Sequence, residues 1–172
     1  MAAYDILVFS QVGEGASRQA IRTNITAATF EVGEPVCIVT NELVDGDGGP
    51  GGDDPTVIYG IAAEPAVSRS NRMAALEIED TLRLCERPAP DKLFVARYFA
   101  TDGAGTQVVP TFAAVSGVPG NLVYDGATNW TFDTGAANLN CEGVDVLDNN
   151  MTRLGDDLTL SGTGAMVLFR FV

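Results

Sequence analysis

Apolar residues in this chain fall into short runs separated by glycine, proline and acidic residues. Residues 35–40 and 56–62 are rich in β-branched side chains, which suit a pleated sheet. Between residues 18 and 25 the apolar side chains alternate with polar ones, as in a strand that buries one face. Glycine and proline at the ends of these runs mark turns. The pattern predicts a protein of short strands in which residues 35–40 and 56–62 pair with each other.

Short apolar runs separated by turn residues continue along the rest of the chain. A hairpin is predicted from two strands, residues 93–99 and 107–115, joined by a glycine-rich turn. Residues 73–87 are ambiguous: apolar and polar positions alternate, but Ala, Leu and Glu favour helix. The alternation favours a strand there. The remaining strands are predicted at residues 6–9, 122–124, 129–132, 144–147, 158–160 and 165–172.

The sharpest break in the pattern lies at Pro88 and Pro90, because neither a helix nor a central strand continues through two prolines. The break predicts two β-rich lobes, residues 1–87 and 88–172, or else one continuous domain. The 19 glycines and 8 prolines favour many turns. The predicted fold class is all-β: a small β-sandwich or barrel-like body of short antiparallel strands with long loops and few or no helices.

The most biased segment, residues 45–54, combines aspartate with glycine. Ordering glycine is entropically unfavourable and the carboxylates repel one another, so we expect a solvated loop between two strands. Clustered carboxylates also suit Ca²⁺, although the spacing breaks the EF-hand pattern. The ligands in this alternative are Asp45, Asp47, Asp53 and Asp54.

Charge and composition argue against several classes of function. The net charge is −13, with one lysine and nine arginines, too few cations for a nucleic acid or an anionic membrane surface. Without histidine, neither Ser-His-Asp nor Cys-His catalysis can be built within the chain. Three widely separated cysteines predict buried or half-buried free thiols in a reducing compartment. We expect no cofactor. We also expect no signal peptide, because no positive charge precedes the first apolar run.

One motif suggests catalysis. Asp133-Thr134-Gly135, after an apolar run, looks like the active-site loop of pepsin-like and retroviral aspartic proteases. In those enzymes two aspartates share one proton and activate a water molecule. The chain has a single such triplet, so a protease would need two copies of the chain. The other interpretation is an ordinary turn at the end of a strand.

Two segments carry a family resemblance. The pattern F-x-x-G-x-P-V at residues 30–36 and the sequence G-I-A-A-E-P-A at residues 60–66 resemble tailed-bacteriophage capsid decoration (cement) proteins and related head proteins. In that family a strand enters after a glycine turn, and a later Gly-Ile/Val-Ala segment returns to the sheet. The resemblance implies a small β-rich protein, often a trimer, that sits on the outside of a phage head and holds neighbouring major capsid subunits together.

On this expectation the protein is a structural component of the virion and not an enzyme. Its partners are the major capsid protein and further copies of itself, with a trimer favoured. It is made in the host cytoplasm and ends on the capsid exterior. The residues expected at contacts with the capsid or with other subunits are Tyr4, Ile6, Val8, Phe9, Tyr124 and Trp130.

The alternative is a carbohydrate- or receptor-binding β-sandwich module of a virion. Exposed Tyr124 and Trp130 beside Asn and Asp side chains could stack on a sugar and hydrogen-bond to it. This alternative depends on exposure of Trp130, whose other expected position is the hydrophobic core.

Overall fold

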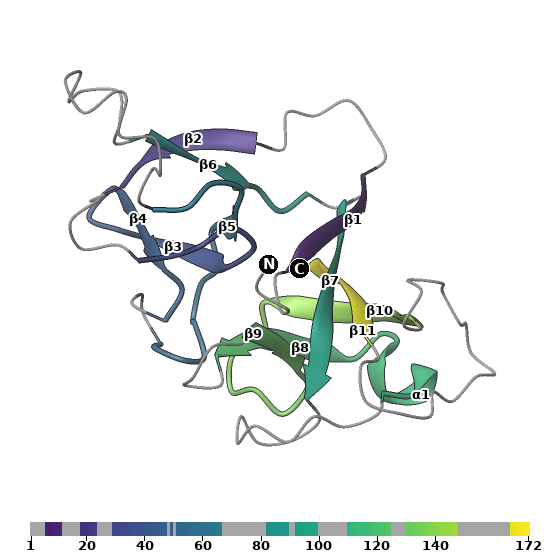
Figure 1. Cartoon of the computed structure of the whole chain (residues 1–172). Coiled ribbons are helices and arrows are strands. Elements are labelled where there is room, and N and C mark those ends of the chain that lie inside the picture. The colour runs from purple at the N-terminus through teal and green to yellow at the C-terminus, as the bar shows by residue number, and fades with distance from the viewer. Residues whose placement is uncertain are drawn as a thin grey trace.

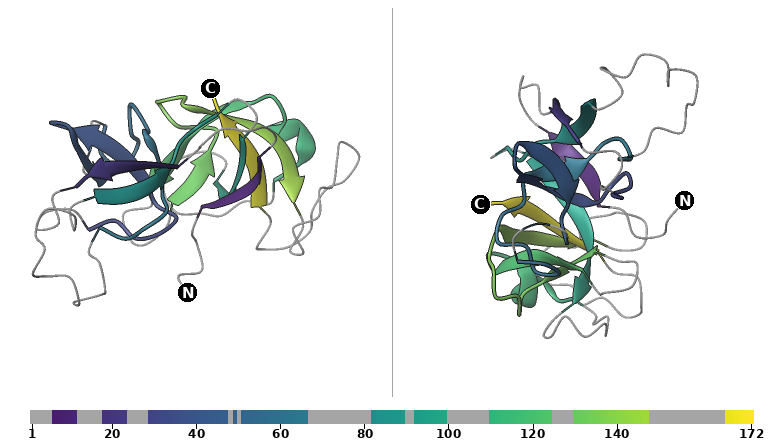
Figure 2. Two further views of the ribbon diagram at one scale, coloured as in Figure 1. Left: turned by 90° about the horizontal axis from the view of Figure 1, so that it is seen from above. Right: turned by 90° about the vertical axis from the view of Figure 1, so that its left-hand side faces the viewer.

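The structure is a computed structural model, and it describes residues 6–11, 18–23, 29–47, 49, 51–66, 82–89, 92–99, 110–124, 130–147 and 166–172. Within these ranges eleven strands form two sheets, accompanied by one short helix. The all-β class predicted from the sequence is confirmed. One sheet closes into a barrel and the other curls into a half-barrel (Figure 1). The two bodies lie side by side (Figure 2).

Five strands close the barrel. Their order is β7 (Lys92–Phe99), β11 (Met166–Phe171), β10 (Cys141–Leu147), β8 (Pro119–Tyr124) and β9 (Trp130–Asp133). Neighbouring strands are antiparallel, except that β9 returns to β7 in parallel. β1 (Leu7–Gln11) pairs with the first half of β7, on the side that β9 occupies further along. Closure leaves the barrel strands without a long free edge.

The half-barrel is an antiparallel sheet with the order β2 (Arg18–Arg22), β6 (Leu82–Glu86), β5 (Gly60–Ala62), β3 (Pro35–Val39) and β4 (Glu42–Asp45). Its two outer strands approach each other where Thr23 bridges to Leu43. The Thr23 hydroxyl, which is buried, donates a hydrogen bond of 2.7 Å to the Leu43 carbonyl. A small core gathers around Phe30, Val36 and Leu43, which are almost completely buried.

Aromatic side chains fill the barrel. Phe94, Phe132 and Phe169 are fully buried, and the Phe169 ring centroid lies 5.8 Å from that of Phe94 and 5.6 Å from that of Phe132. Ile58 and Ile61 belong to the same cluster, although Ile61 lies on a strand of the half-barrel and Ile58 just before it. The apolar core therefore continues from one body into the other.

The predicted pairing of residues 35–40 with 56–62 is wrong for most of its length. β3 forms a hairpin with β4, and only Pro35 and Val36 also pair with β5. The hairpin turn consists of Thr40 and Asn41, whose φ angles are 51° and 65°. Two successive left-handed residues make the type of two-residue turn that matches the twist of a hairpin, and Asn tolerates that conformation well. The turn lacks glycine, which is why the pattern did not mark it.

The predicted strand at residues 107–115 is also wrong where the structure describes it. Phe112–Val115 form the short helix α1, and the Thr111 hydroxyl caps it by accepting a hydrogen bond from the Ala114 N–H. Val115 is buried against Gly143 of β10, where a Cβ would lie 2.3 Å from the Val115 carbonyl oxygen. Packing against a glycine thus holds this apolar segment as a turn of helix. The strand predicted at 158–160 lies outside the described residues.

The chain passes from half-barrel to barrel between β6 and β7, at the predicted break around Pro88. Of the ambiguous segment 73–87, Leu82–Glu86 is strand, as the alternation favoured, and residues 73–81 lie outside the described residues. β1 comes before the break in the chain but pairs with β7 of the barrel. The two bodies are therefore linked by more than one crossing of the chain.

Candidate functional site

The segment between β4 and β5 crosses from the half-barrel onto the barrel. We call residues 46–58 the strap; 48 and 50 are outside the described residues. Gly46 is buried where a Cβ would lie 2.9 Å from both the Pro35 carbonyl oxygen and the Trp130 ring. Further along, the Asp53 carbonyl accepts a hydrogen bond of 2.8 Å from the Tyr124 N–H. The segment joins two strands and exposes Asp47, Gly51 and Asp53, as expected of a solvated loop. Contacts with the barrel nevertheless hold it in place.

The carboxylate of Asp54 anchors the strap to the barrel. Its Oδ1 accepts a hydrogen bond of 2.6 Å from the side-chain amide of Asn121 on β8. Its Oδ2 accepts hydrogen bonds of 2.8 and 3.1 Å from the N–H groups of Ala137 and Asn138, which follow β9. Hydrogen bonds to an ionised acceptor are among the stronger ones in proteins. One side chain thus joins the half-barrel to two separate segments of the barrel.

Three asparagine side chains extend this network. Asn121 and Asn140 both donate to the Pro55 carbonyl at 2.9 Å, and Asn140 also donates to the Asn121 amide oxygen at 3.1 Å. Asn138 donates to the Asp54 carbonyl at 2.8 Å. Asn121 is completely buried, and burial of an amide is costly unless it is hydrogen-bonded. The sequence analysis missed these asparagines, because nothing local distinguishes them from turn residues.

The four aspartates of the calcium alternative do not form a common ligand set, and Asp45 and Asp54 bind different partners. The Asp45 carboxylate accepts hydrogen bonds from the Thr29 N–H and hydroxyl, while Asp54 binds the barrel as described. Asp47 and Asp53 are exposed. Within the described residues, no group of three or more carboxylate or cysteine side chains is arranged to hold a metal ion.

Asp133 of the protease-like motif ends β9 and is only 2% exposed. Its Oδ1 accepts a hydrogen bond of 2.6 Å from the Gly135 N–H, as in a tight turn. The Thr134 hydroxyl lies 3.3 Å from the Tyr98 hydroxyl. A protease dyad would need the carboxylate to face a second chain, whereas here it faces its own turn. The geometry fits the interpretation of the motif as a strand end.

The expected contact residues of the N-terminal segment occupy different environments. Ile6 is 2% exposed, and its N–H donates a hydrogen bond of 3.0 Å to the Gly33 carbonyl. Val8 pairs with Phe94 in the β1–β7 ladder, and Phe9 stands at an irregularity in that ladder. Tyr4 lies outside the described residues. Ile6 therefore joins the barrel to the half-barrel instead of facing outward.

The aromatic pair of the sugar-binding alternative lies against the strap. Trp130 is 4% exposed, with Gly46 against its ring. Tyr124 is half-buried, and the two ring centroids are 5.3 Å apart. Because Trp130 lies in the core cluster, it presents no ring face for a sugar in this structure. Of the two aromatic residues, only Tyr124 contributes appreciable surface.

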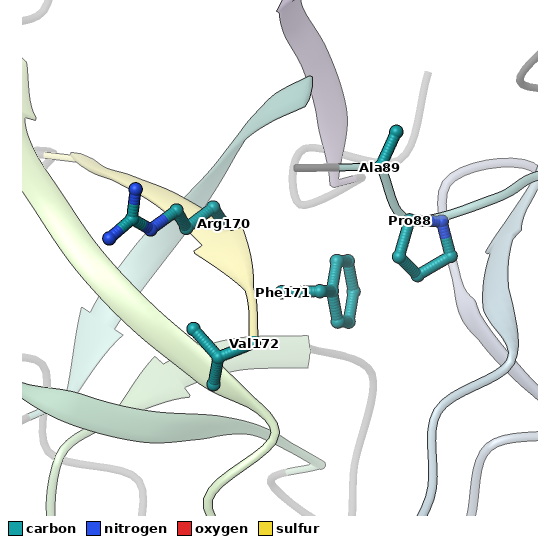
Figure 3. A pocket seen from close by; sticks show the side chains of 5 residues that line it. All are labelled: Pro88, Ala89, Arg170, Phe171 and Val172. Atoms are coloured by element: carbon teal, nitrogen blue, oxygen red, sulfur yellow. The ribbon is translucent and has the colours of Figure 1, made fainter. Parts of the chain in front are cut away.

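An open pocket of about 390 Å³ lies where the end of β11 meets the linker between the two bodies. Its lining is formed by Pro88, Ala89, Arg170, Phe171 and Val172 (Figure 3). The Phe171 ring points toward Pro88, while the Arg170 side chain extends away from the linker. Arg170 forms an exposed ion pair of 3.0 Å with Glu142. The pocket suits a small apolar group.

A buried ion pair stands beside the linker. Lys92, the only lysine in the chain, is completely buried, and its Nζ contacts Glu86 Oε2. The Nζ also lies 5.5 Å from the centroid of the Phe94 ring. Burial of a charge is costly unless it is paired, so each partner requires the other. The pair fixes the end of β6 against the start of β7.

The three thiols are free and buried, as predicted. Burial raises the pKa of Cys37 and of Cys85 to about 11, and it raises the pKa of Cys141 further. A thiol with such a pKa is protonated near neutral pH and is a poor nucleophile. These cysteines therefore behave as small apolar side chains.

Comparisons of the chain with protein-family models, with curated proteins and with solved structures found no match. Among the described residues, no helix is both long enough and apolar enough to cross a membrane. Functional inference therefore depends on the residues of this chain and on where the fold places them.

Proposed function

We propose that this protein is a structural virion protein that binds the outer surface of an assembled phage capsid and stabilises contacts between major capsid protein subunits. The observation that carries the proposal is the position of the two segments that resemble decoration proteins. They are separated by the hairpin and the strap in sequence, and they lie next to each other in the half-barrel.

Hydrogen bonds join these two segments at two places. The Gly33 N–H donates a hydrogen bond of 2.9 Å to the Ala62 carbonyl, and the Ala62 N–H donates one of 2.8 Å to the Glu34 carbonyl. At the far end, the Ala66 N–H donates to the Phe30 carbonyl at 2.8 Å, and both residues are buried in the same cluster. The resemblance implies this arrangement, in which a glycine turn leads into a strand and a later Gly-Ile-Ala segment returns to that strand.

The mechanism follows from mass action. A protein that binds the assembled lattice but not free subunits stabilises the assembly by its binding free energy. With a net charge of −13, copies of this chain repel one another in solution. Specific contacts, and not non-specific association, are then needed for binding to a lattice and for assembly into the favoured trimer.

The experiment is co-sedimentation with heads assembled from the major capsid protein of the phage that encodes the chain. We expect the protein to pellet with heads at a saturable, fixed ratio, and to remain in the supernatant with unassembled subunits. Heads with bound protein should resist heat or chelator treatment longer than bare heads. Absence of binding to heads would refute the proposal.

The same preparation tests the other two interpretations. A glycan array measures sugar binding, and a casein assay at acid pH, with Asp133→Asn as control, measures proteolysis. Binding of a glycan, or a casein-cleaving activity that Asp133→Asn abolishes, would replace the structural role with a different one.

A further inference from the structure

The strap has a composition that opposes order. Five of its thirteen residues are glycine, which loses more backbone freedom on ordering than any other residue. Three are aspartate, and their like charges oppose close packing. A segment of this kind stays ordered only if its contacts offset that cost.

The contacts that offset it lie at three points. At the start, Gly46 fits against the Trp130 ring, and its N–H donates a hydrogen bond of 2.9 Å to the Pro35 carbonyl. In the middle, Asp54 accepts three hydrogen bonds from the barrel. At the end, Ile58 is 8% exposed and belongs to the barrel's core cluster.

At the middle point, one carboxylate acts together with three backbone carbonyl groups. In the described residues between Gly49 and Pro55, the carbonyl groups of Asp53, Asp54 and Pro55 accept four hydrogen bonds from the barrel. The Asp54 carboxylate accepts three more, and these are the charge-assisted ones. The barrel, in contrast, is held by its own closed ladder and by its aromatic core, to which Asp54 contributes nothing.

We infer that the strap is a lock that fixes the half-barrel on the barrel, with Asp54 as its positioning residue. Loss of the Asp54 carboxylate frees the middle of the strap while both bodies stay folded. The locked strap covers Asn121 and Trp130, so its release exposes a buried amide and the ring of the only tryptophan. This inference does not depend on the proposed capsid role.

The test compares Asp54→Ala with Asp53→Ala in the full chain. The two substitutions change the net charge equally and are adjacent, but the Asp53 side chain is exposed, and its carbonyl bond to Tyr124 does not involve the side chain. The fluorescence of Trp130 reports the start of the strap. Residue-resolved hydrogen exchange of the Tyr124, Ala137 and Asn138 amides reports its middle.

In Asp54→Ala we expect exchange of these three amides to rise at least tenfold, and Trp130 to become more accessible to acrylamide, well below the melting temperature. Amides of the β10–β11 ladder should exchange as in the wild type, and Asp53→Ala should match the wild type throughout. Gly46→Ala, which forces a Cβ against Trp130, should raise Trp130 accessibility from the other end. Unchanged exchange of the Tyr124, Ala137 and Asn138 amides in Asp54→Ala, or equal acceleration in the β10–β11 ladder, would overturn the inference.

Discussion

Asn121 donates a hydrogen bond of 2.6 Å to Asp54 across 67 residues of chain. Asn121 lies on β8 next to Leu122 of the barrel core, so by strand alternation its side chain points to the outer face. It is nevertheless completely buried, because the strap covers it. This pair joins the barrel to a segment that the sequence marks as a loop, and it ties the stability of one body to the other.

Asn121→Ala should lower the free energy of unfolding by about 2–3 kcal/mol, because it removes the donor to Asp54 and Pro55 and leaves their acceptors covered. Asn140→Ala, which removes the second donor to Pro55 from a half-buried position, should cost less. Urea denaturation of the three proteins measures both values. Equal stability of Asn121→Ala and the wild type would contradict the structural role of this amide.

Lys92→Met should lower the free energy of unfolding by about 3–5 kcal/mol, because it leaves the Glu86 carboxylate buried without its cation. Glu86→Leu should be similarly destabilising. The double variant should be more stable than either single variant, since an apolar pair replaces a buried ion pair without leaving a lone charge. Denaturation of all four proteins forms a double-mutant cycle. Additive losses would show that the two side chains do not act as a pair.

Glu34→Gln should raise Tm at pH 7 by a few degrees, because it removes a carboxylate charge from a partly buried position. Burial raises the pKa of Glu34 above its ordinary value of 4.5, with the charges of Asp45, Asp47 and Glu31 acting in the same direction. A raised pKa means that the folded state favours protonated Glu34. That stabilisation is present below pH 4.5 and is lost as pH rises through the folded-state pKa.

The glutamine variant mimics the protonated form and can still accept the hydrogen bond of 2.9 Å from the Glu31 N–H. Its advantage should therefore shrink as pH falls below 4.5, where Glu34 is protonated in both states. Melting curves between pH 3.5 and 7.5 check the trend, with the same change at half-buried Glu42, Glu42→Gln, as a control. A lower Tm for Glu34→Gln at pH 7 would contradict this electrostatic account.

Alkaline pH should destabilise the protein through its thiols. Cys37 and Cys85 have a pKa of about 11 in the folded state against an ordinary value of 9.0. The unfolded state therefore loses these protons first, so stability should fall as pH rises from 9 to 11. The slope of unfolding free energy against pH should be smaller in Cys85→Ala than in the wild type. At pH 8 a disulfide reagent should react with the folded protein far more slowly than with the unfolded chain.

Local pattern located most strands and missed the elements that depend on distant partners. Alternation placed Leu82–Glu86, and short apolar runs placed β1, β9 and β11, because side-chain periodicity is a property of the strand itself. The hairpin turn at Thr40 and Asn41 was missed because it uses left-handed residues without glycine. Helix α1 was missed because its apolar residues suit a strand, and contact with Gly143 decides otherwise.

The candidate sites show the same division. Two of the sequence-predicted contact residues, Ile6 and Trp130, are apolar enough to be interface anchors, but both are buried where the two bodies meet. Asp54 was named as one of four aspartates of the calcium alternative, and its carboxylate accepts hydrogen bonds from the Asn121 side chain and the Ala137 N–H. No sequence pattern marked Asn138 and Asn140, because their hydrogen bonds to the strap form only when the strap lies over the barrel.

The sequence by itself determined the all-β class and the burial of the three cysteines, since hydrophobic periodicity and residue type act locally. Only the tertiary structure decided that β9 closes the barrel on β7, and that the acidic glycine-rich segment is a strap and not a free loop. The physical reason is distance along the chain. Asp54 reaches the Asn138 N–H across 84 residues, and a hydrogen bond of that range exists only after the barrel has closed and the half-barrel has packed against it.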